Sequence, residues 1–174
     1  MLDAFISSKT RIKLLLKFFL NPQSSSYLRG LESEFGESTN AIRLELNRFE
    51  SAGLLKSFLN GNKRMFHANE KHPLFNELRN IVLKHLGVDR VIEMVIDRLG
   101  EVKKVFLTGD LAYGRDTGVI DLVIVGDVNR SYLAELVTKA EKLLERKIRY
   151  LVYEPQEEQE LTSNKEKFLL IWNE

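Results

Sequence analysis

The sequence contains no cysteine, which excludes a disulfide framework and a zinc site built on thiolates. Its histidines, His67, His72 and His85, lie too far apart to form a recognisable metal motif. The chain also lacks a P-loop, a hydrolase triad, an internal repeat and a low-complexity tract. We therefore expect no metal site and no cofactor.

Long hydrophobic runs are absent as well. The longest run near the start, Leu14 to Leu20, is interrupted by Lys17 and is far too short to span a bilayer. No small-residue cleavage site accompanies it, so the segment does not resemble a signal peptide. We expect a soluble, cytoplasmic protein with no membrane partner.

Neither sign of charge dominates the whole chain, whose formal net charge is +1. The two halves nevertheless differ. Residues 1–86 carry 13 Lys and Arg against 8 Asp and Glu, a net +5, whereas residues 87–174 carry 13 against 17, a net −4. A basic half beside an acidic half favours two functional units, of which the first is better suited to a polyanion.

The first part of the chain has the pattern of three helices. Apolar residues at helical spacing end before Pro22, which stops the first helix. A second helix is predicted near 27–35. The third is predicted to begin after Ser38 or Thr39, either of which is a good cap, and to end near Ala52.

A predicted β-hairpin follows these helices. Two strand-like runs, Leu54–Leu59 and Lys63–Ala68, flank an Asn-Gly turn at residues 60–61. Three helices and a hairpin, in this order, make a winged helix-turn-helix. Residues 46–55, Leu-Asn-Arg-Phe-Glu-Ser-Ala-Gly-Leu-Leu, resemble the end of the recognition helix in ArsR-like and MarR-like bacterial transcriptional regulators. The resemblance covers about residues 9–69 and implies a domain that binds double-stranded DNA.

The third helix separates into a core face and an outward face when its residues are placed at roughly 100° each. Ile42, Leu46, Phe49 and Gly53 fall on the core side. The outward face and the hairpin carry polar and basic side chains of the types that contact bases and phosphates, and one apolar residue able to contact a thymine methyl group or a protein. The candidate DNA-binding residues are Ser38, Thr39, Asn40, Arg43, Leu44, Asn47, Arg48, Lys63 and Arg64.

The same pattern leaves other partners open. Glu45 and Glu50 lie near the outward face, where they would repel phosphate. Winged helices also serve protein contacts, so an antitoxin-like interaction module is an alternative. A DNA reader of this kind is expected to be a homodimer, with recognition helices about 34 Å apart. The helices predicted over 74–85 and 89–99, closed by Gly87 and Gly100, or residues 2–19, are the candidates for its interface.

The second half changes to buried strands near 105–107 and 120–125, with a later helix near 131–146 and further strands at 148–153 and 168–172. Residues 107–125, Leu-Thr-Gly-Asp-Leu-Ala-Tyr-Gly-Arg-Asp-Thr-Gly-Val-Ile-Asp-Leu-Val-Ile-Val, resemble the signature of minimal nucleotidyltransferases of the DNA polymerase beta superfamily. Gly109, Ala112 and Gly114 match that signature, as does the spacing to Asp121. The resemblance covers about residues 89–174.

The family holds divalent metal ions with carboxylates on its strands, and this sequence departs at those positions. Val119 stands where the family has its first acid, and Asp110 replaces the phosphate-binding serine. Residues 148–153 supply no third acid. The resemblance therefore implies an inactive domain with no catalytic residues, in which Gly109, Asp110 and Asp121 are the candidates for binding a nucleotide.

These patterns together predict an α+β chain. A winged helix-turn-helix domain at 1–72 is followed by connecting or dimerisation helices at 73–100. A small α/β nucleotidyltransferase-like domain with a mixed sheet is predicted at 101–174. The predicted function is a dimeric transcriptional regulator, whose second domain assists dimerisation or senses a small-molecule or nucleotide effector. The alternative from another class is an active nucleotidyltransferase, which would require Mg²⁺ at Asp121.

Overall fold

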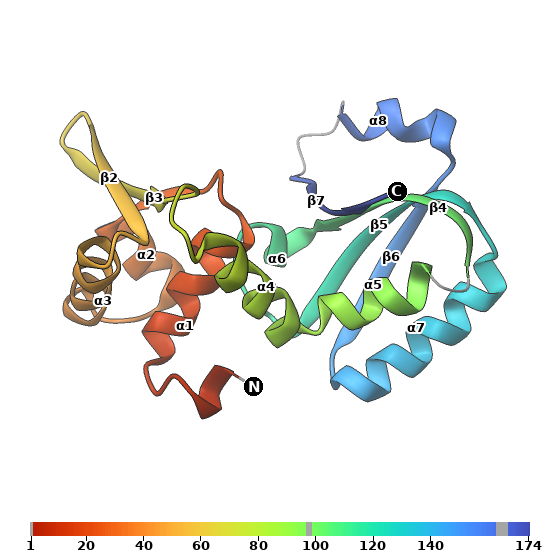
Figure 1. The fold of residues 1–174 in the computed structure, drawn as a ribbon, viewed down its shortest axis with the longest axis horizontal. Coiled ribbons are helices and arrows are strands. Elements are labelled where there is room, and N and C mark those ends of the chain that lie inside the picture. The colour runs from red at the N-terminus through yellow and green to blue at the C-terminus, as the bar shows by residue number, and fades with distance from the viewer. Residues whose placement is uncertain (1, 97–98, 163–166) are drawn as a thin grey trace. The chain divides into compact units, whose positions relative to one another are not determined.

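The computed structural model describes residues 2–96, 99–162 and 167–174. The chain divides into two compact units, Met1–His85 and Leu86–Glu174 (Figure 1). Both combine helices with a β-sheet, so the α+β class predicted from the sequence is observed. The sequence predicts domain boundaries at 72/73 and 100/101, whereas the structure has one boundary, at 85/86.

The first unit contains four α-helices, and side-chain caps explain where two of them begin. The Ser8 hydroxyl accepts a hydrogen bond from the Arg11 amide at 3.2 Å, and the Ser38 hydroxyl accepts one from the Ala41 amide at 3.2 Å. The first helix continues as a π-helical segment, Leu16–Leu20. The helices are α1 (Lys9–Leu15), α2 (Leu28–Phe35), α3 (Thr39–Ser51) and α4 (Phe75–Leu86), and a 3₁₀ turn at Leu2–Ala4 precedes them.

A small antiparallel sheet completes the first unit. Its order is β1 (Ser25–Tyr27), β3 (Lys63–Ala68) and β2 (Leu55–Asn60). Strands β2 and β3 form a hairpin with a two-residue loop, in which Gly61 has a φ of 57° that favours glycine. The core beneath is made by large side chains of the first helical stretch, α2 and α3, including Leu14, Phe18, Phe19, Leu31, Ile42 and Leu46.

The second unit is built on a mixed four-stranded sheet in the order β6-β5-β4-β7. Helix α7 connects two parallel strands, β5 and β6, while the other pairs are antiparallel. Figure 1 shows α5 and α7 on one side of the sheet and α8 on the other. The elements are α5 (Val88–Ile96), β4 (Gly100–Thr108), α6 (Gly109–Ala112), β5 (Val119–Val128), α7 (Arg130–Leu144), β6 (Lys147–Tyr153), a 3₁₀ turn (Pro155–Glu157), α8 (Glu158–Thr162) and β7 (Leu169–Asn173).

Strand β5 forms the centre of this unit's core. Its residues from Leu122 to Val125 are buried in succession, as expected for a strand covered on both faces. Leu161 packs against Val123 and Val125 on the side of α8. Asn129 caps α7 by accepting a hydrogen bond from the Tyr132 amide at 3.0 Å.

Several predicted elements differ from the observed ones. Strand β1 lies where the sequence predicts no strand. Its backbone pairs with β3 although its serine-rich sequence lacks an apolar stripe. Gly100 is the first residue of β4 rather than the end of a helix, and a Cβ there would lie 2.7 Å from the Asp127 carbonyl oxygen. The preceding helix is predicted over 89–99, and residues 97–98 of that range lie outside the described residues.

Among the helices of the described ranges, none combines the length and the apolar character needed to cross a membrane.

Candidate nucleic-acid interface

Helix α3 has the core face that its periodicity predicts, but Glu45, which the sequence places near the outward face, is buried. Ile42, Leu46 and Phe49 have exposed fractions of 0%, 1% and 5%, so the core face is correct. Arg43 and Asn47 lie on the exposed side. Because the core face is fixed by packing, the direction of the outward side chains is fixed with it.

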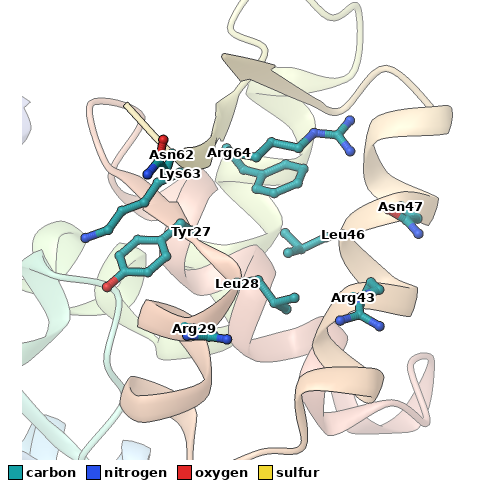
Figure 2. Close-up of a pocket in the computed structure, with 10 residues that line it drawn as sticks. Tyr27, Leu28, Arg29, Arg43, Leu46, Asn47, Asn62, Lys63 and Arg64 are labelled. Atoms are coloured by element: carbon teal, nitrogen blue, oxygen red, sulfur yellow. The ribbon is translucent and has the colours of Figure 1, made fainter. Parts of the chain in front are cut away.

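A groove of about 740 Å³ lies between α3, the hairpin and the beginning of α2 (Figure 2). It contains four of the predicted DNA-binding residues, two from α3 and two from the start of β3. Within the described part of the chain, no acidic residue lines it. Its lining residues are Tyr27, Leu28, Arg29, Arg43, Leu46, Asn47, Asn62, Lys63, Arg64 and Phe66.

Two arginines in this groove are available for a ligand. Arg29 and Arg43 are exposed, and neither forms an ion pair with any residue of the described ranges. Arg29 follows the first residue of α2, and the N-cap of that helix provides no side-chain hydrogen bond. Cationic side chains beside uncapped backbone N–H groups favour a phosphate or another anion.

Lys63 and Tyr27 form a second contact at the groove edge. The Lys63 Nζ lies 4.3 Å from the centroid of the Tyr27 ring, a cation–π geometry. Tyr27 pairs with Met65 across the β1–β3 register, so the sheet positions this ring. The contact keeps the ammonium group at the surface of the groove, where an anion can reach it.

Arg64 was predicted to contact DNA, but its guanidinium is already bound to side chains of the protein. Its Nη2 donates hydrogen bonds to both Glu50 carboxylate oxygens, at 2.7 and 2.6 Å, and its Nε donates to the Ser57 hydroxyl at 3.1 Å. Ser57 also donates to Glu50 at 2.5 Å. The Ser57 hydrogen bond and the Arg64 ion pair hold the pKa of Glu50 below its ordinary value, against the effect of burial. Arg64 therefore ties the hairpin to α3.

Glu45 and Arg48 form a related network. Glu45 is only 4% exposed, and its carboxylate accepts hydrogen bonds from Arg11 at 2.8 and 3.2 Å and from Arg48 at 3.1 Å. Burial raises the pKa of Glu45, but hydrogen bonds from Arg11 and Ser8 outweigh it, so the net pKa is lowered. Neither Glu45 nor Glu50 is therefore an isolated carboxylate, and arginines offset the charge through which each was expected to repel phosphate.

The remaining predicted residues of α3 do not line the groove. The Ser38 hydroxyl is occupied as the helix cap. Asn40 is exposed, Thr39 is half-buried and Leu44 is 53% exposed. These side chains lie on or beside the outward surface of α3.

Six residues of the groove lie outside the predicted DNA-binding set. Two of them, Leu46 and Phe66, are buried core residues, and the other four are Tyr27, Leu28, Arg29 and Asn62. Asn62 belongs to the hairpin turn, which was already predicted to approach a ligand. The other three come from the start of α2, and their signal was weak because only the tertiary arrangement brings this helix end beside α3. The one clue in the sequence is an arginine placed just after the predicted start of a helix.

The second unit brings its three candidate nucleotide-binding residues together. Gly109 and Asp121 line one cleft of about 330 Å³, and Gly109 and Asp110 line an adjoining one of about 260 Å³. Both carboxylates are engaged by arginine. Arg149 donates to Asp121 at 2.5 and 2.8 Å, and Arg115 lies 2.7 Å from Asp110. In the described ranges, no group of three His, Asp or Glu side chains could hold a metal ion.

Comparison with protein-family models found no match, and comparison with curated proteins found none either. Part of the chain is similar to a solved structure, the crystal structure of human N-acetylserotonin methyltransferase in complex with SAM, with 13% sequence identity and a TM-score of 0.31. The match covers 57% of this chain and 33% of that methyltransferase. A similarity this low supports no conclusion about fold or activity.

Proposed function

We propose that the protein is a DNA-binding transcriptional regulator whose first unit is a winged helix-turn-helix. The observation that carries the proposal is the groove between α3 and the hairpin, which four basic side chains line without an acid among the described residues. Helix α3 would read base edges in the major groove through Arg43 and Asn47. The hairpin would lie along the backbone, with Lys63 contacting phosphate.

The proposed regulator is a homodimer, as the pairing of two recognition helices on DNA requires. An apolar pocket of about 380 Å³ supports this part of the proposal, because it is formed by the N-terminal segment and α4, the two segments that the sequence favours for dimerisation. Phe5 is 82% exposed beside it and Ile81 is 40% exposed. The pocket is lined by Leu2, Phe5, Ile6, Leu15, Leu78, Ile81 and Val82.

The second unit is proposed to be a nucleotidyltransferase-like domain without activity. Support comes from the order of elements, in which β4, the Gly109 turn, β5, α7 and β6 follow the family signature in sequence. Support for the loss of activity comes from Val119 on β5, where the resemblance expects an acid, and from β6, which carries no acid at all. This domain would assist dimerisation or bind an effector.

Binding to a fluorescent duplex library, measured by anisotropy across a salt series, tests the DNA proposal. We expect wild-type affinity to fall steeply as salt rises and a few sequences to be enriched. Arg43→Ala should relax specificity. Lys63→Ala should weaken binding to all duplexes and reduce the salt slope by about 1.

Lys71→Ala is the matched control, since Lys71 is an exposed cation of the same unit that does not line the groove. It should bind nearly as wild type does. The proposal is wrong if the wild-type protein shows no salt-sensitive affinity for any duplex at low salt. An interaction module for another protein would then replace it.

A further inference from the structure

Asp121 and Arg149 face each other on the parallel strands β5 and β6. They are direct partners in the strand register, so their side chains leave the same face of the sheet. The Arg149 Nε and Nη2 donate to the two oxygens of the carboxylate at 2.5 and 2.8 Å. This bidentate geometry is the strongest form of an arginine–carboxylate contact.

The neighbouring register pair on this face contains no acid. Val119 precedes Asp121 by two residues and is the register partner of Lys147. The nucleotidyltransferase resemblance expects acids at 119 and 121 and a further acid on the strand after α7. Instead, the two positions of β6 that face 119 and 121 both carry cations.

Among the described residues that line the two clefts, no carboxylate besides Asp121 is free to complete a metal site. Asp110, which lines the adjoining cleft, is held by Arg115 at 2.7 Å. Gly109 is packed so closely that a Cβ there would lie 2.2 Å from Asp121 Oδ2. Mg²⁺ requires about six oxygen ligands in near-octahedral geometry, and the residues present do not fit it.

We infer that the guanidinium of Arg149 occupies the place of a divalent cation at Asp121, so that the cleft binds no divalent metal. A metal ion would have to displace two charge-assisted hydrogen bonds and remain beside the positive charge of Arg149. The loss of activity then comes from substitution of the cation itself as well as from missing acids. The inference rests on the proposed nucleotidyltransferase-like domain and is independent of DNA binding.

Electron paramagnetic resonance of Mn²⁺, titrated with the full chain, measures this directly. Wild type should leave the signal of free Mn²⁺ unchanged at millimolar metal. Arg149→Asp should bind Mn²⁺ at least about tenfold more tightly than wild type, because it replaces the cation with a ligand oxygen. Mg²⁺ should also raise the melting temperature of Arg149→Asp but not that of wild type.

Arg130→Asp is the charge-matched control, since Arg130 is exposed at the start of α7, and it should behave as wild type does. Arg149→Gln removes the cation without adding an acid and serves if Arg149→Asp does not fold. It should bind Mn²⁺ more weakly than the aspartate variant but more tightly than wild type. Two results overturn the inference: wild type binds Mn²⁺ and Asp121→Asn abolishes that binding, or the folded Arg149 variants bind no more Mn²⁺ than wild type.

Discussion

At the scale of single residues, the acids of α3 illustrate what a sequence pattern omits. Helical periodicity places Glu45 and Glu50 near the outward face, and this is where an unpaired carboxylate would repel DNA. The structure supplies Arg11 and Arg48 for Glu45 and supplies Arg64 for Glu50. Periodicity gives the direction of a side chain, but the partner comes from another element, so the pairing was not predictable from the helix alone.

Removing the charge of Glu50 tests how its ion pair with Arg64 affects DNA binding. In Glu50→Gln, Arg64 is released from its ion pair and one negative charge leaves the interface, so affinity for duplex DNA at low salt should rise about threefold to tenfold. The free energy of unfolding should fall by less than about 1 kcal/mol, because Arg64 is largely exposed. Anisotropy titrations and thermal melts measure the two effects.

Glu70→Gln changes the net charge of the same unit by the same amount at an exposed position outside the groove. Its affinity should remain close to that of wild type. Equal gains in the two variants would show that net charge, rather than release of Arg64, causes the effect.

At the scale of elements, glycines decide where two of the turns can form. The Asn-Gly pair predicted the hairpin, and the structure has it at this place, with Gly61 at positive φ. The Gly109 turn was predicted only by family resemblance. Its physical requirement is the close approach of Asp121, which no local pattern reveals. Strand β1 was missed for a similar reason, because its pairing with β3 joins residues far apart in the sequence.

Gly109→Ala and Gly118→Ala separate collision from backbone strain. Both glycines have positive φ, 60° and 78° respectively, but a Cβ at 118 meets nothing within 4 Å. Gly118→Ala should therefore lower the free energy of unfolding only by the strain of placing alanine in the left-handed conformation, about 1–2 kcal/mol. Gly109→Ala should lower the free energy of unfolding by at least about 1 kcal/mol more than this, because its Cβ collides with the Asp121 carboxylate. Urea denaturation measures both, and equal losses would contradict the packing argument.

At the scale of the whole molecule, the difference in charge between the two halves agrees with a division into two units. The sequence predicted two domains with connecting helices between them, and the structure assigns α4 to the first unit up to His85 and α5 to the second. The boundary could not be placed from periodicity because both helices are strongly amphipathic. Only contacts decide which core each one joins.

Because each unit has its own core, the full chain should unfold in two calorimetric transitions. Leu14 and Ile124 are both 0% exposed, one in each unit. Leu14→Ala should lower the temperature of only one transition and Ile124→Ala that of only the other. Each variant should lower the free energy of unfolding of its own unit by about 2–5 kcal/mol. A single transition that both variants shift equally would show that the two units unfold as one.

The tie between Arg64, Ser57 and Glu50 has a consequence for how the first unit meets its ligand. Three side chains join the hairpin to α3 before anything binds. The conformational entropy of the hairpin is therefore lost during folding rather than during association. Such a preorganised surface meets its partner largely as a rigid body, so discrimination between partners depends on shape as much as on charge.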